Sequence, residues 1–227
     1  MKKYLMILLS GILAGICITF GATVYLMCLS YEWDPFIAKF VGAFMFCIGL
    51  FTIIHFNLWL YTGKIGYAID KKPSYLIDCF VSFIGNIIGA VGLSALLKLS
   101  VDNARLEEQA ISVVNAKLDS SWYSVFIMSM MCGMMIYLAV EGHKRCPYSL
   151  GKVLFVFLPI MLFIICGFEH VIANACYFTF AATFSPKAFG YFVLMFVGDA
   201  LGSMLFALLL KAIDKLNTKE EAQNDEK

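Results

Sequence analysis

Two ionisable residues stand side by side in one of the most apolar stretches of the chain. The segment FIICGFEHVIANA, residues 163–175, carries Glu169 and His170 at its centre, although its other residues are typical of a membrane-spanning helix. An ionisable group at membrane depth costs about 2.5–3.5 kcal/mol on insertion scales, so such residues mark functional sites. Imidazole changes charge near neutral pH. We therefore expect His170 to line a pore and to set its selectivity and pH dependence.

A second polar site is expected in the segment LYTGK, where Thr62 stands before Gly63. A threonine hydroxyl donates and accepts hydrogen bonds, and glycine permits unusual backbone turns. We expect Thr62 to meet His170 across the pore. We expect Glu169 to accept hydrogen bonds from backbone N–H groups at a helix break, in preference to relaying protons. Glu169 and Asn174 are thus expected to be structural residues at that break.

The other two histidines are weaker candidates. His55 lies inside the second long apolar run, where it either lines the pore or bonds a neighbouring group, and the sequence leaves both interpretations open. His143 lies in EGHKRCP, which we interpret as a solvated cytoplasmic loop, and we expect no special role for it.

The composition is that of an integral membrane protein. The 227 residues are 61% hydrophobic and 15% charged, whereas soluble domains are about half apolar and a quarter charged. The net charge of +1 gives no sign of a nucleic-acid partner. The eight cysteines form no C-x-x-C pair, so we expect free thiols, no metal site and no cofactor. No second cluster of potential catalytic residues is evident, which argues against an enzyme.

Hydropathy predicts six membrane-spanning helices, because a helix needs about 20 apolar residues to cross a bilayer. The first run is too long for the apolar core of a signal peptide, so we expect no cleavable leader. The second and fifth runs are too long for a plain span and carry polar residues near their centres, so each is predicted to be a broken helix. The predicted spans cover residues 4–29, 36–69, 74–98, 119–141, 152–180 and 188–211.

These spans predict an all-α integral membrane protein with one transmembrane domain, residues 1–216, and a charged cytoplasmic tail, residues 217–227. One longer polar link, about 99–118, joins the third and fourth spans. If both termini lie on one side, most of the 17 Lys and Arg residues fall on that side. Such residues concentrate in cytoplasmic loops. We therefore expect a multi-pass protein of the bacterial cytoplasmic (inner) membrane with both termini in the cytoplasm.

Two glycine motifs indicate an internal repeat. FIGNIIGA at 83–90 matches FVGDALGS at 196–203 with the pattern F-x-G-[ND]-x-x-G-[AS], and SGILAGI in the first span matches SMMCGMM in the fourth. Glycines four residues apart allow close helix packing. Three spans in each half make the second half inverted, and inverted repeats with interrupted helices are typical of transporters. We expect the breaks near 57–63 and 166–170.

Several of these motifs resemble those of the formate–nitrite transporter family. GFEHVIAN is similar to the family's GFEH-x-x-AN signature, LYTGK to its L-[FY]-T loop, GNIIGA to its third-span motif and AGICI to its first-span motif. The resemblance covers nearly the whole chain. It implies an aquaporin-like protomer with its own pore, a homo-pentamer, and passage of small monovalent anions such as formate, nitrite and hydrosulfide.

The resemblance also implies where the pore narrows. Counted from the two most specific motifs, an outer constriction falls on Phe46 and Phe163, and an inner one falls on Leu50 and Leu60. Leu60 and Tyr61 match the family's gating loop. Thr62 and His170 would then lie between the two constrictions.

Two transport routes follow from this arrangement, because a bare anion in an apolar neck would lose its hydration. His170 either donates a hydrogen bond or a proton, so that the solute crosses as its neutral weak acid, or it is charged and attracts the anion. In the second route Lys117, which matches a family lysine thought to favour anions, assists while Thr62 replaces lost water. The sequence leaves both routes open.

Two departures from the family pattern bear on the substrate. Cys132-Gly133 stands where formate-channel members carry Cys-Asn, and Trp59 stands where many members have an acidic residue. Cys132-Gly133 and LYTGKIGY look more like the hydrosulfide-channel branch. The chain is also expected to lack the amphipathic N-terminal segment of some members. The alternative function is an aquaporin-like channel for small neutral solutes, against which the absence of an NPA motif counts.

Overall fold

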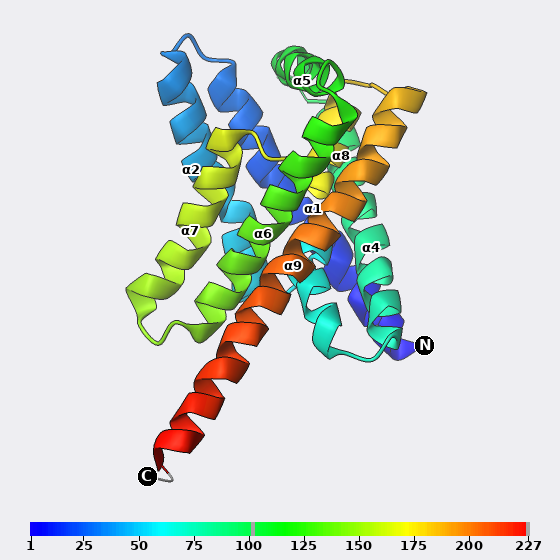
Figure 1. The fold of residues 1–227 in the computed structure, drawn as a ribbon. Helices are drawn as coiled ribbons and strands as arrows, with labels where there is room; N and C mark the ends of the chain where they lie inside the picture. The colour runs from blue at the N-terminus through cyan, green and yellow to red at the C-terminus, as the bar shows by residue number, and fades with distance from the viewer. Residues whose placement is uncertain (101–102, 226–227) are drawn as a thin grey trace.

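The computed structural model describes residues 1–100 and 103–225, and within them it contains helices and no strands (Figure 1). Six helices are long and apolar enough to cross a membrane. The six predicted spans are therefore confirmed as helices. They are α1 (Lys2–Leu29), α2 (Pro35–His55), α4 (Ser74–Leu97), α6 (Trp122–Arg145), α7 (Ser149–Cys166) and α9 (Pro186–Asp225).

Both overlong spans are divided, as predicted. The second consists of α2, the short helix α3 (Tyr61–Lys64) and the 3-10 helix η1 (Ile65–Asp70). The fifth consists of α7 and α8 (Val171–Phe180). The expected all-α fold with two broken helices is thus confirmed. The second break is close to the predicted 166–170, whereas the first ends earlier than the predicted 57–63 because α3 already begins at Tyr61.

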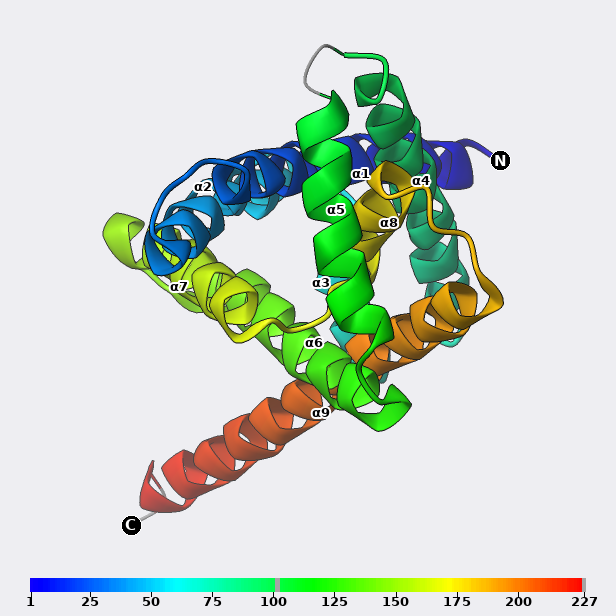
Figure 2. The same cartoon turned by 90° about the horizontal axis from the view of Figure 1, so that it is seen from above.

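Two other elements differ from the expectation. The polar link contains α5 (Asn103–Leu118), which lies across the molecule over α8 (Figure 2). Its apolar residues Leu106, Ala110 and Val114 are four positions apart and all buried, so they form one face of a helix. In addition, α9 continues to Asp225, so no helix end marks the boundary drawn at residue 216.

Both termini lie at the same end of the helix bundle, which we call the terminal face (Figure 1). The link between α6 and α7 lies at this end as well, whereas the link between α1 and α2 lies at the opposite end. This arrangement is what an even number of spans requires.

The internal repeat appears as two equivalent helix pairs, because α1 packs along α4 and α6 packs along α9. In α4, Gly89 lies against the backbone carbonyl of Ile12, and in α9, Gly202 lies against the backbone of Met130. A β-carbon at either glycine would collide with backbone atoms, which cannot rotate away as a side chain can. The predicted glycine stripes therefore hold both pairs together, as expected for an inverted repeat of three spans each.

Replacing Gly89 tests this packing. Gly89→Ala should lower the stability by about 1–3 kcal/mol, because α1 must move away from α4. Gly92→Ala is the matched control on the same helix, since a β-carbon there meets open space, and it should be neutral or slightly stabilising. Thermal melting in detergent measures both variants. Equal melting temperatures would contradict the proposed close contact.

Candidate pore site

The two helix breaks are built in the same way. Asn57 after α2 and Gly167 after α7 have left-handed backbones, with φ of 51° and 73°. The next N–H in each case, from Leu58 and from Phe168, donates to a carbonyl five residues earlier at 2.8 Å. This pattern is a Schellman C-cap. The unusual turn expected at Gly63 therefore lies at Asn57, and Gly63 belongs to α3.

Each short helix that follows a break is capped by the polar residue of the repeated glycine motif. The Tyr61 N–H donates to Asn86 Oδ1 at 2.8 Å, and the Val171 N–H donates to Asp199 Oδ2 at 2.9 Å. Asn86 and Asp199 are both fully buried. These two residues were not among our candidates, although the [ND] position of the repeat was the signal that could have identified them.

The two capping residues differ in how fully they are bonded. Asn86 also donates from Nδ2 to the carbonyls of Gly11 and Trp59, at 2.9 and 2.8 Å. Asp199 Oδ1 has no hydrogen-bond partner among the described residues. Asn86 therefore joins the first break to α1. Asp199 makes one hydrogen bond at the second break, in which it accepts from the Val171 N–H.

Thr62 and His170 meet, as predicted, and both are buried. Thr62 Oγ1 lies 2.9 Å from His170 Nε2. The Ala173 N–H donates to His170 Nδ1 at 3.3 Å, so His170 is also the N-cap of α8. A ring nitrogen that accepts carries no hydrogen, and we therefore assign the hydrogen of the neutral ring to Nε2. His170 then donates to Thr62, whose own hydroxyl hydrogen remains available to a solute.

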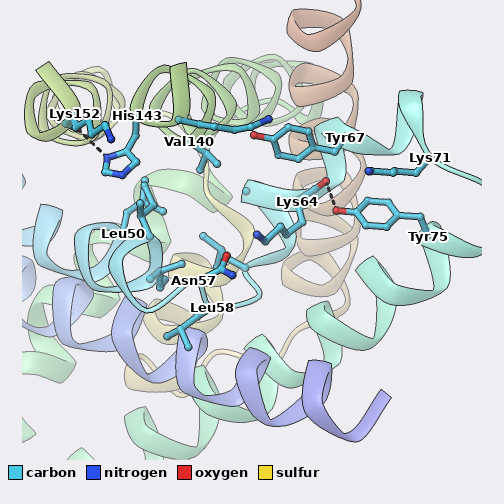
Figure 3. A pocket seen from close by; sticks show the side chains of 15 residues that line it. Leu50, Asn57, Leu58, Lys64, Tyr67, Lys71, Tyr75, Val140, His143 and Lys152 are labelled. Carbon is cyan, nitrogen blue, oxygen red and sulfur yellow. Dashed lines mark hydrogen bonds between the residues drawn. The ribbon is translucent and has the colours of Figure 1, made fainter. Parts of the chain in front are cut away.

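Two cavities approach this contact from opposite ends. The larger one, about 540 Å³, opens at the terminal face and is lined in part by Leu50, Leu60 and Gly63 (Figure 3). We call it the lysine vestibule because Lys64, Lys71, Lys144 and Lys152 also line it. The smaller one, about 50 Å³, is lined in part by Lys117, Phe163 and His170, and we call it the outer pocket. His170 lines the outer pocket, whereas its partner Thr62 lines neither cavity and stands next to Gly63, which lines the lysine vestibule.

The four predicted constriction residues lie where the cavities end. Phe46 and Phe163 are buried and pack edge to face, with ring centroids 5.8 Å apart. Leu50 and Leu60 are buried beside the lysine vestibule. Tyr61 does not line either cavity, since its ring stacks on Phe196 at 4.7 Å. Narrowing of a pore at the four residues remains a prediction.

The partners of Glu169 differ from those expected. Its Oε2 accepts from Lys117 Nζ at 2.5 Å and from Asn174 Nδ2 at 2.9 Å, and the backbone N–H groups expected as donors do not bind it. The carboxylate is 8% exposed and the Lys117 side chain 13%, so the pair is shielded from solvent. The charge of Lys117 is therefore balanced by Glu169, and Asn174 also donates to the His170 carbonyl at the break.

The remaining histidines lie near each other. His55 Nδ1 is 2.7 Å from the carbonyl of Phe51, which agrees with the second of our two interpretations, and its ring is exposed. His143 lies in the last turn of α6 and lines the lysine vestibule, so its assignment to a loop was wrong. The two rings are 5.6 Å apart.

Comparisons with known proteins agree with this architecture. A family model described as "Formate/nitrite transporter" matches residues 1–213. The chain is 28% identical over 222 residues to "Uncharacterized transporter YrhG" of Bacillus subtilis, covering 90% of this chain and 83% of that protein. It is 24% identical over 188 residues to "Formate channel FocA" of Haemophilus influenzae, covering 76% and 65%. A solved "Pentameric formate channel with formate bound" has the same fold, with a TM-score of 0.75, 21% identity, and coverage of 96% and 98%.

Asp199 tests the capping of the second break. Asp199→Leu should destabilise the protein by about 1–3 kcal/mol, because it leaves the Val171 N–H buried without an acceptor. Asp199→Asn keeps an acceptor, as Asn86 does in the other half, and should melt close to the original protein. If both variants melted at the same temperature, the Asp199 hydrogen bond would not support the break.

The Lys117–Glu169 pair is tested by a double-mutant cycle. Lys117→Met should lower the stability by about 3 kcal/mol or more, since it leaves a buried carboxylate without its cation. Adding Glu169→Gln should restore much of the loss, because the amide carries no charge. Melting temperatures of the two single variants and the double variant provide the comparison. Additive losses would show that the two side chains are independent.

Proposed function

We propose that each protomer conducts a small monovalent anion or its neutral weak acid. The chain belongs to the formate/nitrite transporter family, because the family model matches residues 1–213 of the 227 residues of the chain. Proteins of this family are channels and transporters, so the chain is a transport protein and not an enzyme. The observation that carries the proposal is the buried Thr62–His170 contact, which lies between the outer pocket, lined by His170, and the lysine vestibule, lined by Gly63 next to Thr62.

The hydrogen bonds around His170 favour the neutral route of the two that the sequence left open. A charged ring would place an Nδ1–H against the N–H of Ala173, which now donates to that nitrogen. The second route also required Lys117, whose charge is balanced by Glu169. We therefore propose that a solute accepts a hydrogen bond from the Thr62 hydroxyl and replaces Thr62 as the acceptor of the Nε2–H of neutral His170, so that both residues act as donors to the solute. The expectation that titration of His170 sets the pH dependence is revised accordingly.

The donors Thr62 and His170 matter because the solute loses its water of hydration between the apolar constrictions. A bare anion between Phe46 and Phe163, or between Leu50 and Leu60, would have few partners to replace its water. The proposed donors lie between these two apolar pairs and supply hydrogen bonds where hydration is lost. A solute that crosses as its weak acid would avoid most of the remaining cost.

We further propose a homo-pentamer in the cytoplasmic membrane of a bacterium, with the terminal face in the cytoplasm. The pentameric state of the solved formate channel with the same fold supports the assembly. The concentration of Lys and Arg near the terminal face supports the orientation. Hydrosulfide is the proposed substrate in preference to formate or nitrite, because Cys132-Gly133 and LYTGKIGY look more like the hydrosulfide-channel branch.

A competitive flux panel tests the function. Proteoliposomes containing the full chain should take up hydrosulfide, formate and nitrite faster than protein-free vesicles, with little uptake of chloride. Acetate measures how far the apolar constrictions tolerate a larger acid. Uptake of water or glycerol without any of these anions would instead support the neutral-solute channel.

Variants at the polar pair test the mechanism. Thr62→Val removes the hydroxyl at nearly constant volume. It should lower flux about ten-fold, because loss of one hydrogen bond of about 1.4 kcal/mol from the transport barrier corresponds to a ten-fold change in rate. His170→Phe should lower flux further. His170→Asn retains a donor and an acceptor and should conduct with the same pH profile as the original protein. If the flux of the original protein changed with pH between about 5 and 8 and that change disappeared in His170→Asn, His170 would titrate and would not remain neutral.

A further inference from the structure

Four lysines from different segments converge on one cavity. Lys64 ends α3, Lys71 follows η1, Lys144 lies in α6 and Lys152 lies in α7, and all four line the lysine vestibule. Figure 3 labels Lys64, Lys71 and Lys152 among the lining residues. A requirement for positive charge on the cytoplasmic side could be met by lysines anywhere in the links of that face. Convergence on a cavity from four segments is a more specific arrangement.

The acidic residues nearby do not cancel this charge. Asp70 binds Lys211, and Glu141 binds Arg145 at 2.7 Å, so each has a cation that does not line the vestibule. Lys144 shares Glu141 at 3.5 Å. Within the described part of the chain, the other three vestibule lysines, Lys64, Lys71 and Lys152, have no carboxylate within ion-pair distance. The vestibule therefore carries a surplus of positive charge, which a cavity with apolar walls concentrates.

The size of the vestibule exceeds what the transported solute needs. A volume of about 540 Å³ corresponds to roughly 18 water molecules at about 30 Å³ each, whereas each proposed solute is a single ion or molecule with at most three non-hydrogen atoms. The volume lies within the range of about 300–1,000 Å³ that is usual for small-molecule sites. Asn57 and His143 also line the cavity and add further polar groups.

The end of the vestibule next to the pore would stop a large anion. Leu50, Leu58 and Leu60 line it on the way to Thr62, and all three are buried. The cost of removing a charge from water rises steeply with its magnitude, and a polyvalent anion has no small neutral form to cross an apolar neck. Such an anion would bind in the vestibule and remain there.

We propose that the lysine vestibule is a binding site for a polyvalent oligophosphate anion, which closes the pore from the terminal face when bound. The lysines provide charge-assisted hydrogen bonds to phosphate oxygens, and the leucines prevent passage. The site is separate from the Thr62–His170 contact, so binding does not depend on the identity of the transported solute.

Binding of inorganic pyrophosphate to the full-length protein in detergent tests the site directly, by calorimetry and by melting temperature. Pyrophosphate should bind and raise the melting temperature, whereas KCl at the same ionic strength should not. Lys71→Gln and Lys152→Gln should each weaken binding about ten-fold, the value of one hydrogen bond between charged groups. Lys72→Gln is the matched control, because Lys72 is the exposed neighbour of Lys71 and does not line the vestibule.

The outcomes separate this proposal from the proposed transport function, because binding is measured without transport. No binding, an equal effect of KCl, or an equal loss in Lys72→Gln would overturn the site. If Lys71→Gln or Lys152→Gln failed to fold, the charge-conserving Lys→Arg variant at the same position should bind pyrophosphate, and its failure to bind would count against the site.

Closure of the pore is tested in proteoliposomes. At ten times its dissociation constant, pyrophosphate on the terminal face should lower formate flux about ten-fold, and pyrophosphate on the opposite face should have no effect. Flux that persists with the vestibule occupied, or equal inhibition from both faces, would overturn the closure.

Discussion

The structure depends on satisfying backbone hydrogen bonds at two helix breaks inside an apolar environment. A lipid-facing break would leave N–H and C=O groups without partners, each at a cost of several kcal/mol. Asn86 and Asp199 remove much of this cost, because they accept from the first N–H groups of α3 and α8. Both residues belong to the repeated motif whose glycines bring α4 against α1 and α9 against α6. The same motif thus packs α4 on α1 and α9 on α6, and it supports the two breaks beside which Thr62 and His170 reach each other.

Residues with a strong local pattern were predictable from the sequence. Six apolar runs, two of them overlong, gave the spans and both breaks, and the GFEH and LYT segments gave the Thr62–His170 contact. What could not be predicted depends on contacts distant in sequence. Glu169 was expected to bind nearby backbone but meets Lys117, 52 residues away, because α5 crosses over α8. The four lysines of the lysine vestibule come from four separate segments, so no single stretch of sequence contains their pattern.

In the proposed pore, the ionisable residues in and beside the outer pocket leave it without net charge. Glu169 and Lys117 neutralise each other beside the outer pocket. His170 accepts from the Ala173 N–H, which fits an uncharged ring. Positive charge in surplus lies instead at the terminal face, around the lysine vestibule. An anion would be attracted at the mouth and would meet neutral donors at the neck, so that it is drawn in without being bound too tightly to leave.

The protonation of His170 in lipid is the most direct test of this account. Nitrogen-15 NMR of histidine-labelled protein would isolate its signal in a background where His55 and His143 are replaced by glutamine. The account predicts one protonated nitrogen, Nε2, and one unprotonated nitrogen, Nδ1, throughout the range from about pH 5 to 8 in which an unperturbed imidazole changes charge. A ring with both nitrogens protonated in that range, or with its hydrogen on Nδ1, would contradict the neutral donor at the centre of the proposed pore.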